Sequence, residues 1–174
     1  KGSFNNLLPG KYTVTETVAT RYAEQESKTV KVESGKTATV TFSNVLKKWR
    51  AKVTKIDADT TTAQGDATLS GAVYGVYNSG KLIDKYTTDK NGSFTTSYYV
   101  CGANWTIKEI TPSEGYLLNE SEYKIGAEAK NYTIEKNSIS MGVTEDILKG
   151  KISIIKHTDD GSTKIETPEK GAEF

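Results

Sequence analysis

The sequence has little that would support disulfides, a membrane span or a metal centre. Cys101 is the only cysteine, so an internal disulfide is excluded and covalent stiffening would need other chemistry. No apolar run is long enough to insert into a membrane. His157 is the only histidine, so we expect no metal site, no cofactor and no histidine-dependent catalytic triad. The 23 Lys and Arg residues nearly balance the 22 Asp and Glu residues, which argues against nucleic acid as a partner.

Proline and methionine are also scarce, whereas tyrosine, threonine and valine are frequent. Because β-branched and aromatic residues favour strands, we predict an all-β protein. No signal peptide or cell-wall sorting sequence is visible, and we expect a fragment of a longer protein. Alternating patterns and turn residues predict strands at 11–17, 28–32, 37–42, 51–57, 72–78, 81–87, 93–99, 104–110, 131–135, 139–143 and 151–156.

Internal repeats indicate how the chain is divided. GAVY at 71–74 returns as GAEF at 171–174, and VTKIDADT around Lys55 returns as IIKHTDDG around Lys156. The repeat is about 100 residues long, the size of one β-sandwich domain. We therefore expect tandem immunoglobulin-like β-sandwich domains, one complete and two partial, with boundaries at 1–46, 47–148 and 149–174.

An acid occupies the apolar face of one predicted strand. Trp105, Ile107 and Glu109 share parity, so they lie on one face of that strand. A carboxylate on such a face must be paired or neutral. The pattern recurs in GKYTVTE, where Glu16 shares a face with a tyrosine and a valine. Two occurrences make a coincidence less credible.

A lysine shares parity with the apolar residues of the first strand of each repeat, Lys55 in one and Lys156 in the next, so both are expected to face inward. A buried amine and a buried acid can pair as ions, or desolvation can drive both to their neutral forms. A carbonyl side chain ends each repeat, Asn44 in the first and Asp146 in the second. An amine, an acid and a carbonyl are the components of an amide-forming site.

These features together resemble the Cna B-type, or SpaA-like prealbumin-like, domains of Gram-positive pilins and surface adhesins. The resemblance covers nearly the whole chain. It is carried by the first-strand lysines, the GAxF or GAxY strand, TDKNG at 88–92, LPGKYTVTE, PSEGY, and FSN before the next domain. It implies prealbumin-like sandwiches that act as structural modules.

The resemblance also implies an intramolecular isopeptide bond from lysine to asparagine or aspartate, assisted by a glutamate. For the middle domain it implies a bond from Lys55 to Asp146 with Glu109 as the catalytic residue. For the first domain it implies Asn44 with Glu16 as catalytic residue and a lysine that precedes residue 1. Each site would react once, so this is self-processing rather than enzymatic turnover. The bond in the middle domain would close a loop of about 90 residues, which would stabilise the folded domain by about 4–5 kcal/mol in the loop-entropy treatment.

The partner of Lys55 has a second candidate. Apolar alternation at 139–143 places Glu145 on the inward face. Aligning NVL at 44–46 with DIL at 146–148 favours Asp146 instead, provided that a β-bulge, or an offset after the strand, turns it inward. We favour Asp146.

Simpler interpretations stay open for several residues. Without an isopeptide bond, Lys55 and Glu109 would form a buried ion pair. Cys101 would be an inert thiol. The loop after the first strand of the middle domain matches no calcium-binding loop, and we expect a solvated turn for its three aspartates, Asp57, Asp59 and Asp66.

We expect an extracellular stalk or pilus-shaft segment in the cell wall or pilus of a Gram-positive bacterium. Its partners would be neighbouring domains of one array or neighbouring copies in a filament, and chain outside residues 1–174 would cover the partial domains. The alternative is an adhesin module that binds a host protein or glycan through Tyr98, Tyr99 and Trp105. The parity of Trp105 places it in the core, which counts against that alternative.

Overall fold

The computed structural model describes residues 2–155. Within them the regular secondary structure consists of β-strands and one turn of 3-10 helix. The all-β prediction is therefore confirmed. The elements are β1 (Gly10–Val14), β2 (Lys28–Val32), β3 (Lys48–Asp57), β4 (Val73–Asn78), β5 (Lys81–Thr87), β6 (Ser93–Thr95), β7 (Tyr99–Val100), β8 (Trp105–Thr111), β9 (Glu122–Lys124), η1 (Ala129–Asn131) and β10 (Lys136–Glu145).

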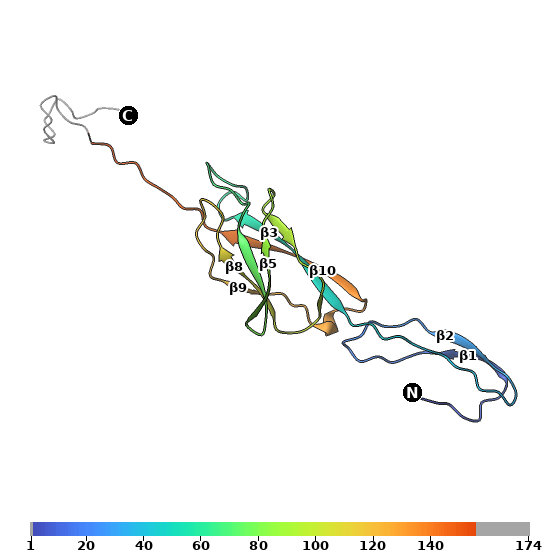
Figure 1. Cartoon of the computed structure of the whole chain (residues 1–174). Coiled ribbons are helices and arrows are strands. Elements are labelled where there is room, and N and C mark those ends of the chain that lie inside the picture. The colour runs from blue at the N-terminus through green and yellow to red at the C-terminus, as the bar shows by residue number, and fades with distance from the viewer. Residues whose placement is uncertain (1, 156–174) are drawn as a thin grey trace, which may run out of the picture.

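Strands β3 to β10 form a sandwich of two sheets (Figure 1). One sheet has the order β10-β3-β6, with β7 pairing the beginning of β3, and the facing sheet has the order β5-β4-β8-β9. Strand β10 runs parallel to β3, from Lys136 opposite Lys48 to Glu145 opposite Asp57. The first and last strands of the sandwich are therefore hydrogen-bonded neighbours.

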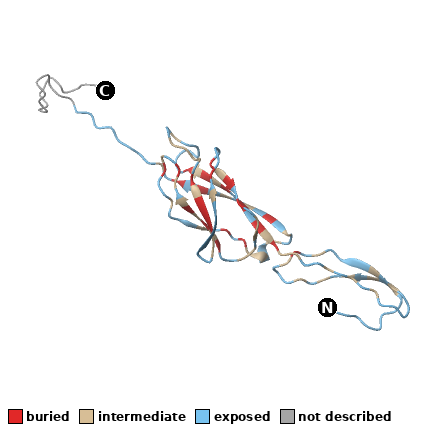
Figure 2. Ribbon diagram, viewed as in Figure 1, coloured by how far each residue is buried: buried red, intermediate tan, exposed pale blue. Residues whose placement is uncertain are grey.

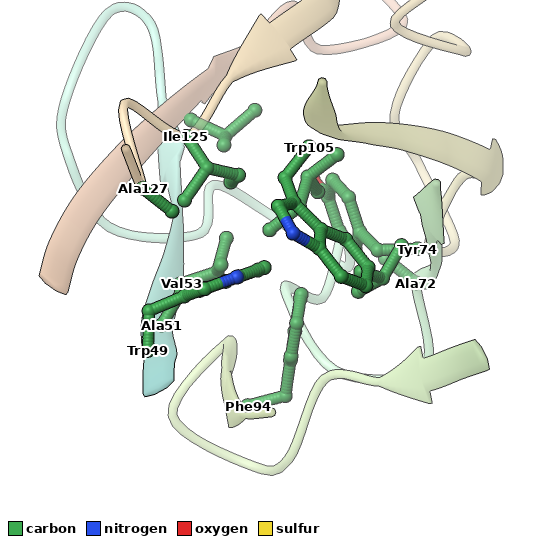
Figure 3. Close-up of a cluster of buried hydrophobic side chains, with 12 residues drawn as sticks. Trp49, Ala51, Val53, Ala72, Tyr74, Phe94, Trp105, Ile125 and Ala127 are labelled. Carbon is green, nitrogen blue, oxygen red and sulfur yellow. The ribbon is translucent and has the colours of Figure 1, made fainter. Parts of the chain in front are cut away.

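The core lies between the two sheets and follows the alternation of their strands (Figure 3). Trp49 and Val53 on β3 are fully buried, and Ile107 on β8 meets them from the other sheet. Trp105 is 7% exposed and packs edge-to-face on Trp49, with ring centroids 5.2 Å apart. The prediction that Trp105 belongs to the core is confirmed.

Three predicted strands between residues 37 and 135 differ from the structure. Residues 37–42 do not form a regular strand, because no described segment lies beside them with a ladder of backbone hydrogen bonds. The segment 131–135 begins with the last residue of η1 and continues as an irregular loop, and β10 begins after it. The predicted strand 93–99 is divided into β6 and β7. The short strand β9 was not predicted, since three residues are too few to show a period of two.

Strands β1 and β2 form a separate antiparallel pair that lies beyond one end of the sandwich (Figure 1). Lys47 joins the two parts: its backbone N–H donates to Arg21, and its ammonium donates to the carbonyl of Ala129 at 3.1 Å. Most residues around β1 and β2 are exposed or half-buried, whereas buried residues concentrate in the sandwich (Figure 2). The apolar face of the first part is only half-buried at Tyr12, Val14, Val40 and Phe42.

The chain leaves the sandwich at the opposite end (Figure 1). Ile147 pairs with Tyr116, and the backbone N–H of Leu148 donates to Gly115 at 2.8 Å. From there to residue 155 the chain is exposed and has no regular secondary structure, although a strand was expected at 151–156. Lys156, a predicted site residue, lies outside the described residues.

Candidate functional site

Lys55 points into the sandwich from β3 and is 1% exposed. Its backbone N–H donates to the carbonyl of Gly92 at 2.8 Å, so the TDKNG turn holds this part of the strand. Gly92 has φ of 68°, and a Cβ there would lie 2.8 Å from the Cβ of Leu69, so the turn requires glycine. The Lys55 ammonium also lies 4.9 Å from the ring centroid of Tyr116.

Glu109 faces Lys55 from β8 in the opposite sheet and is 2% exposed. Its Oε1 lies 2.9 Å from the Lys55 Nζ, and its Oε2 accepts a hydrogen bond from the backbone N–H of Asn119 at 2.9 Å. Both carboxylate oxygens are therefore satisfied. The structure brings together the lysine and the glutamate that the strand parities placed inward.

Glu145, rather than Asp146, completes this cluster. It is 1% exposed, and its Oε2 lies 3.7 Å from the Lys55 Nζ. Strand β10 keeps a regular register with β3 up to the pair Glu145 and Asp57, so no β-bulge turns the next side chain inward. Asp146 is exposed, and the inward orientation expected for it is wrong.

The carboxyl group of Glu145 is held asymmetrically. Its Oε1 accepts a hydrogen bond from the Tyr74 hydroxyl at 2.7 Å, while its buried Oε2 has no hydrogen-bond partner among the described residues. Burial raises the pKa of Glu145, and the nearby Glu109 adds to the rise, against the opposing effects of Tyr74 and Lys55. Glu145 is therefore disposed to hold a proton.

Asp57 lies at the end of β3 and is buried rather than solvated, so that expectation is wrong for this aspartate. Its carboxylate accepts hydrogen bonds from the backbone of Asp59 and Thr60, the side chain of Gln64 and the hydroxyl of Tyr116. Burial alone would raise the pKa of Asp57, but these hydrogen bonds outweigh it and lower the pKa to about 2. Asp57 is an anionic anchor for the loop and for Tyr116.

Two other aspartates of that loop are exposed, as expected: Asp66, and Asp59, which pairs with Lys149 at 2.8 Å. Within residues 2–155 no group of three or more His, Cys, Asp or Glu side chains is placed to hold a metal ion. Over the same residues, no helix is long and apolar enough to span a bilayer.

The first part of the chain contains a second, incomplete cluster. The Asn44 side-chain amide donates to Glu16 Oε1 at 3.2 Å. The other oxygen of Glu16 is buried and has no hydrogen-bond partner in the described part of the chain. The structure thus brings together the predicted acid and carbonyl of this part.

The side chains considered for ligand binding or for a reactive thiol, Tyr98, Tyr99 and Cys101, are engaged in contacts within the domain or partly buried. Tyr99 is half-buried and packs on Trp105 at the edge of the core, with ring centroids 4.9 Å apart, and its hydroxyl donates to Asp84. Tyr98 is half-buried with Arg50 5.0 Å from its ring centroid. Burial raises the pKa of Cys101, which disfavours the reactive thiolate.

Sequence reasoning did not single out Tyr74 or Tyr116. Tyr74 lies in GAVY, where its parity with Ala72 and Val76 would have placed it inward. Tyr116 lies in the PSEGY motif but outside any strand, so no periodicity could have indicated its position.

Comparisons with known proteins place this sandwich in a family. The family model of the SpaA prealbumin-like fold domain matches residues 50–141. The trypsin-resistant surface T6 protein of Streptococcus pyogenes serotype M6 is 40% identical over 77 residues, which are 44% of this chain and 14% of that protein. This chain therefore spans about one seventh of the length of that relative.

Solved structures show the same likeness. The Bacillus anthracis TIE protein superposes with a TM-score of 0.63 and 27% identity over 82% of this chain and 26% of that chain. The T6 backbone pilin of serotype M6 Streptococcus pyogenes, described as a modular three-domain structure, is 36% identical over 47% of this chain and 16% of that chain, with a TM-score of 0.41. The T6 protein is described as a surface protein and as a backbone pilin. Because the family model matches more than half of the sequence, this chain belongs to the family of SpaA prealbumin-like fold domains.

Proposed function

We propose that this chain is a structural segment of the stalk or pilus shaft of a Gram-positive cell-surface protein, exposed outside the cell. Its family and the T6 surface protein support this role. The β1–β2 pair also lies beyond one end of the sandwich, and the chain leaves the sandwich at the other end, which is the arrangement expected of one domain in a linear array (Figure 1). In this proposal residues 1–46, 47–148 and 149–174 belong to three successive domains, and neighbouring domains or copies are the partners.

We further propose that the middle domain stiffens itself with an isopeptide bond from Lys55 to Glu145. One observation carries this proposal: the Lys55 ammonium is fully buried between two glutamates, 2.9 Å from Glu109 and 3.7 Å from Glu145. Asp146 is exposed, so Glu145 is the carboxyl group at the end of the last strand that lies within reach of Lys55. The raised pKa of Glu145 favours the protonated acid, which is the form that can lose water.

The chemistry would be a condensation. A proton passes from the Lys55 ammonium to Glu109, and the resulting amine attacks the carboxyl carbon of Glu145. The C–N bond forms, and the bond to Oε2 breaks as that oxygen leaves as water. Glu109 gives a proton to the leaving hydroxyl and takes one from the lysine nitrogen. One amine and one protonated acid become one amide and one water, without an oxidant or a cofactor. Since the site is consumed, the chain is not a turnover enzyme.

The bond would connect the first and last strands of the sandwich. Strands β3 and β10 run parallel and side by side, so a tensile load on the chain ends would shear their hydrogen bonds. A covalent link between Lys55 and Glu145 would carry that load. It would also reduce the conformational entropy of the unfolded chain, which stabilises the folded domain by about 4–5 kcal/mol in the loop-entropy treatment.

Intact mass of the full chain, measured after denaturation, tests this proposal. We expect a mass lower than the sequence mass by one water, and a cross-linked peptide that joins Lys55 to Glu145. The Lys55→Ala and Glu109→Ala variants should each restore the full sequence mass. An unmodified mass in the folded, purified wild-type protein would leave a buried ion cluster and no isopeptide bond.

Glu16 and Asn44 fit the same role in the first domain. Their contact at 3.2 Å and the unpartnered Glu16 oxygen support a site that lacks its lysine. We propose that chain preceding residue 1 supplies this lysine. Asparagine would then release ammonia instead of water. Lys156 would serve the third domain in the same way.

A further inference from the structure

We infer that Tyr74 is a catalytic residue of the self-linking reaction, as the hydrogen-bond donor to the oxygen of Glu145 that remains on the amide. This inference rests on the proposed bond between Lys55 and Glu145. It assigns to Tyr74 the stabilisation of negative charge and leaves Glu109 to move protons.

The two sheets divide the site between them. Lys55 and Glu145 lie on the neighbouring parallel strands β3 and β10 of one sheet. Tyr74 and Glu109 lie directly opposite each other on β4 and β8 of the facing sheet. The reacting pair therefore comes from one sheet and the two assisting side chains come from the other.

A local irregularity in the facing sheet sets the positions of the assisting pair. Val73 pairs with Thr111, whereas Tyr74 pairs with Glu109, so Ile110 is skipped. Such a bulge re-aims the side chains beside it. Here Tyr74 and Glu109 both face the interior and both are essentially inaccessible to solvent.

The Tyr74 hydroxyl selects between the two oxygens of Glu145. It lies 2.7 Å from Oε1, while Oε2 faces Lys55 at 3.7 Å. Attack by the amine on the carboxyl carbon places negative charge on the oxygen that does not leave. A donor already directed at Oε1 would stabilise that charge without reorganisation, and Oε2 remains free to depart as water.

The environment keeps Tyr74 in the donor form. Burial raises the pKa of its hydroxyl above the usual value, and the adjacent Glu145 raises it further. The ring also packs in the core beside Phe94, with centroids 5.4 Å apart, so it is fixed before the reaction. The following repeat has phenylalanine at this place, in GAEF, so loss of the hydroxyl alone is a conservative change.

The test is the rate of bond formation in the full chain. Wild type, Tyr74→Phe and Tyr86→Phe would be made by cell-free translation, synthesis would be stopped, and samples would be denatured at intervals for intact mass. Tyr86→Phe is the matched control, since the Tyr86 hydroxyl is hydrogen-bonded to the Tyr99 hydroxyl and does not contact the cluster of Lys55, Glu109 and Glu145. We expect Tyr74→Phe to lose water roughly 10²–10³-fold more slowly, the usual effect of removing one such donor, and Tyr86→Phe to react like wild type.

Folding is followed separately by the fluorescence of the core residues Trp49 and Trp105. If Tyr74→Phe does not fold, the rate of water loss is measured with 3-fluorotyrosine at position 74, because this residue keeps the hydroxyl and makes it a stronger hydrogen-bond donor. A faster reaction supports the role, and an unchanged rate overturns it.

The outcomes separate this inference from the proposed function. A wild type linked from Lys55 to Glu145, with Tyr74→Phe equally fast, overturns the role of Tyr74 and leaves the isopeptide proposal standing. A link to Asp146 likewise overturns it, because Tyr74 contacts Glu145. A wild type that never loses water overturns both.

Discussion

Lys55 and Glu109 meet in the interior from opposite sheets, with Nζ 2.9 Å from Oε1 and both side chains fully buried. Removing one member of such a pair leaves an uncompensated buried charge, which typically costs about 3–5 kcal/mol. A single substitution at either residue would therefore change stability even if no isopeptide bond existed. Experiments on this site need variants that remove the bond without leaving a lone charge.

The identity of the partner carboxyl can be read from two alanine variants of adjacent residues. We expect Glu145→Ala to retain the full sequence mass, because it removes the only carboxyl group within reach of Lys55 on β10. Asp146→Ala should still be lighter by one water, because that side chain is exposed. Intact mass measures both, and the reverse result would show that the register of β10 shifts by one residue.

The contribution of the bond to stability can be isolated with the double variant Lys55→Met and Glu109→Gln. Both replacements are neutral and close in size to the native side chains, so no lone charge remains where the ion pair was. Compared with this variant, we expect the linked wild type to be more stable by about 4–5 kcal/mol. Denaturant titration followed by tryptophan fluorescence measures the difference. Equal midpoints would show that other interactions stabilise the domain.

The turn that supports Lys55 should be sensitive to the addition of one methyl group. Gly92 and Gly80 both have positive φ, but a Cβ at Gly92 would lie 2.8 Å from that of Leu69, whereas the space at Gly80 is open. We expect Gly80→Ala to cost about 1–2 kcal/mol, from the left-handed backbone alone. Gly92→Ala should cost about 1–3 kcal/mol more, from overpacking. Equal melting temperatures for the two variants would contradict the packing of this turn.

Asp57 should make the protein sensitive to acid. Its pKa in the folded protein is about 2, below the ordinary value of 3.8, so its contribution to stability is present above about pH 4 and is lost as the pH falls towards 2. We expect Asp57→Asn to melt at a lower temperature at pH 7 and to lose less stability than wild type between pH 4 and 2. Melting temperatures across this range measure both effects.

Asp59→Asn is the matched control for that experiment, since the Asp59 side chain is exposed and forms only a surface pair with Lys149. Its melting curve should follow that of wild type at each pH. Parallel acid profiles for wild type and Asp57→Asn would show that Asp57 is not the titrating anchor.

The sequence by itself determined which side chains face inward. In a strand the side chains alternate, so apolar neighbours with the same parity were enough to orient Lys55, Glu109 and Trp105. The same rule placed Glu145 on the inward face of the last strand. The all-β class followed from residue types that favour strands, and the division of the chain was expected from its repeats.

Only the tertiary structure decided which inward residues meet. The pairing of β3 with β10 and the packing of one sheet on the other join segments far apart in the chain, and no local pattern encodes those distances. The regular ladder left Asp146 exposed, because no bulge interrupts it before the strand ends. Asp57 became buried because its loop folds back and donates hydrogen bonds to it. Tyr74 gained its role from a hydroxyl that reaches across the sandwich to Glu145.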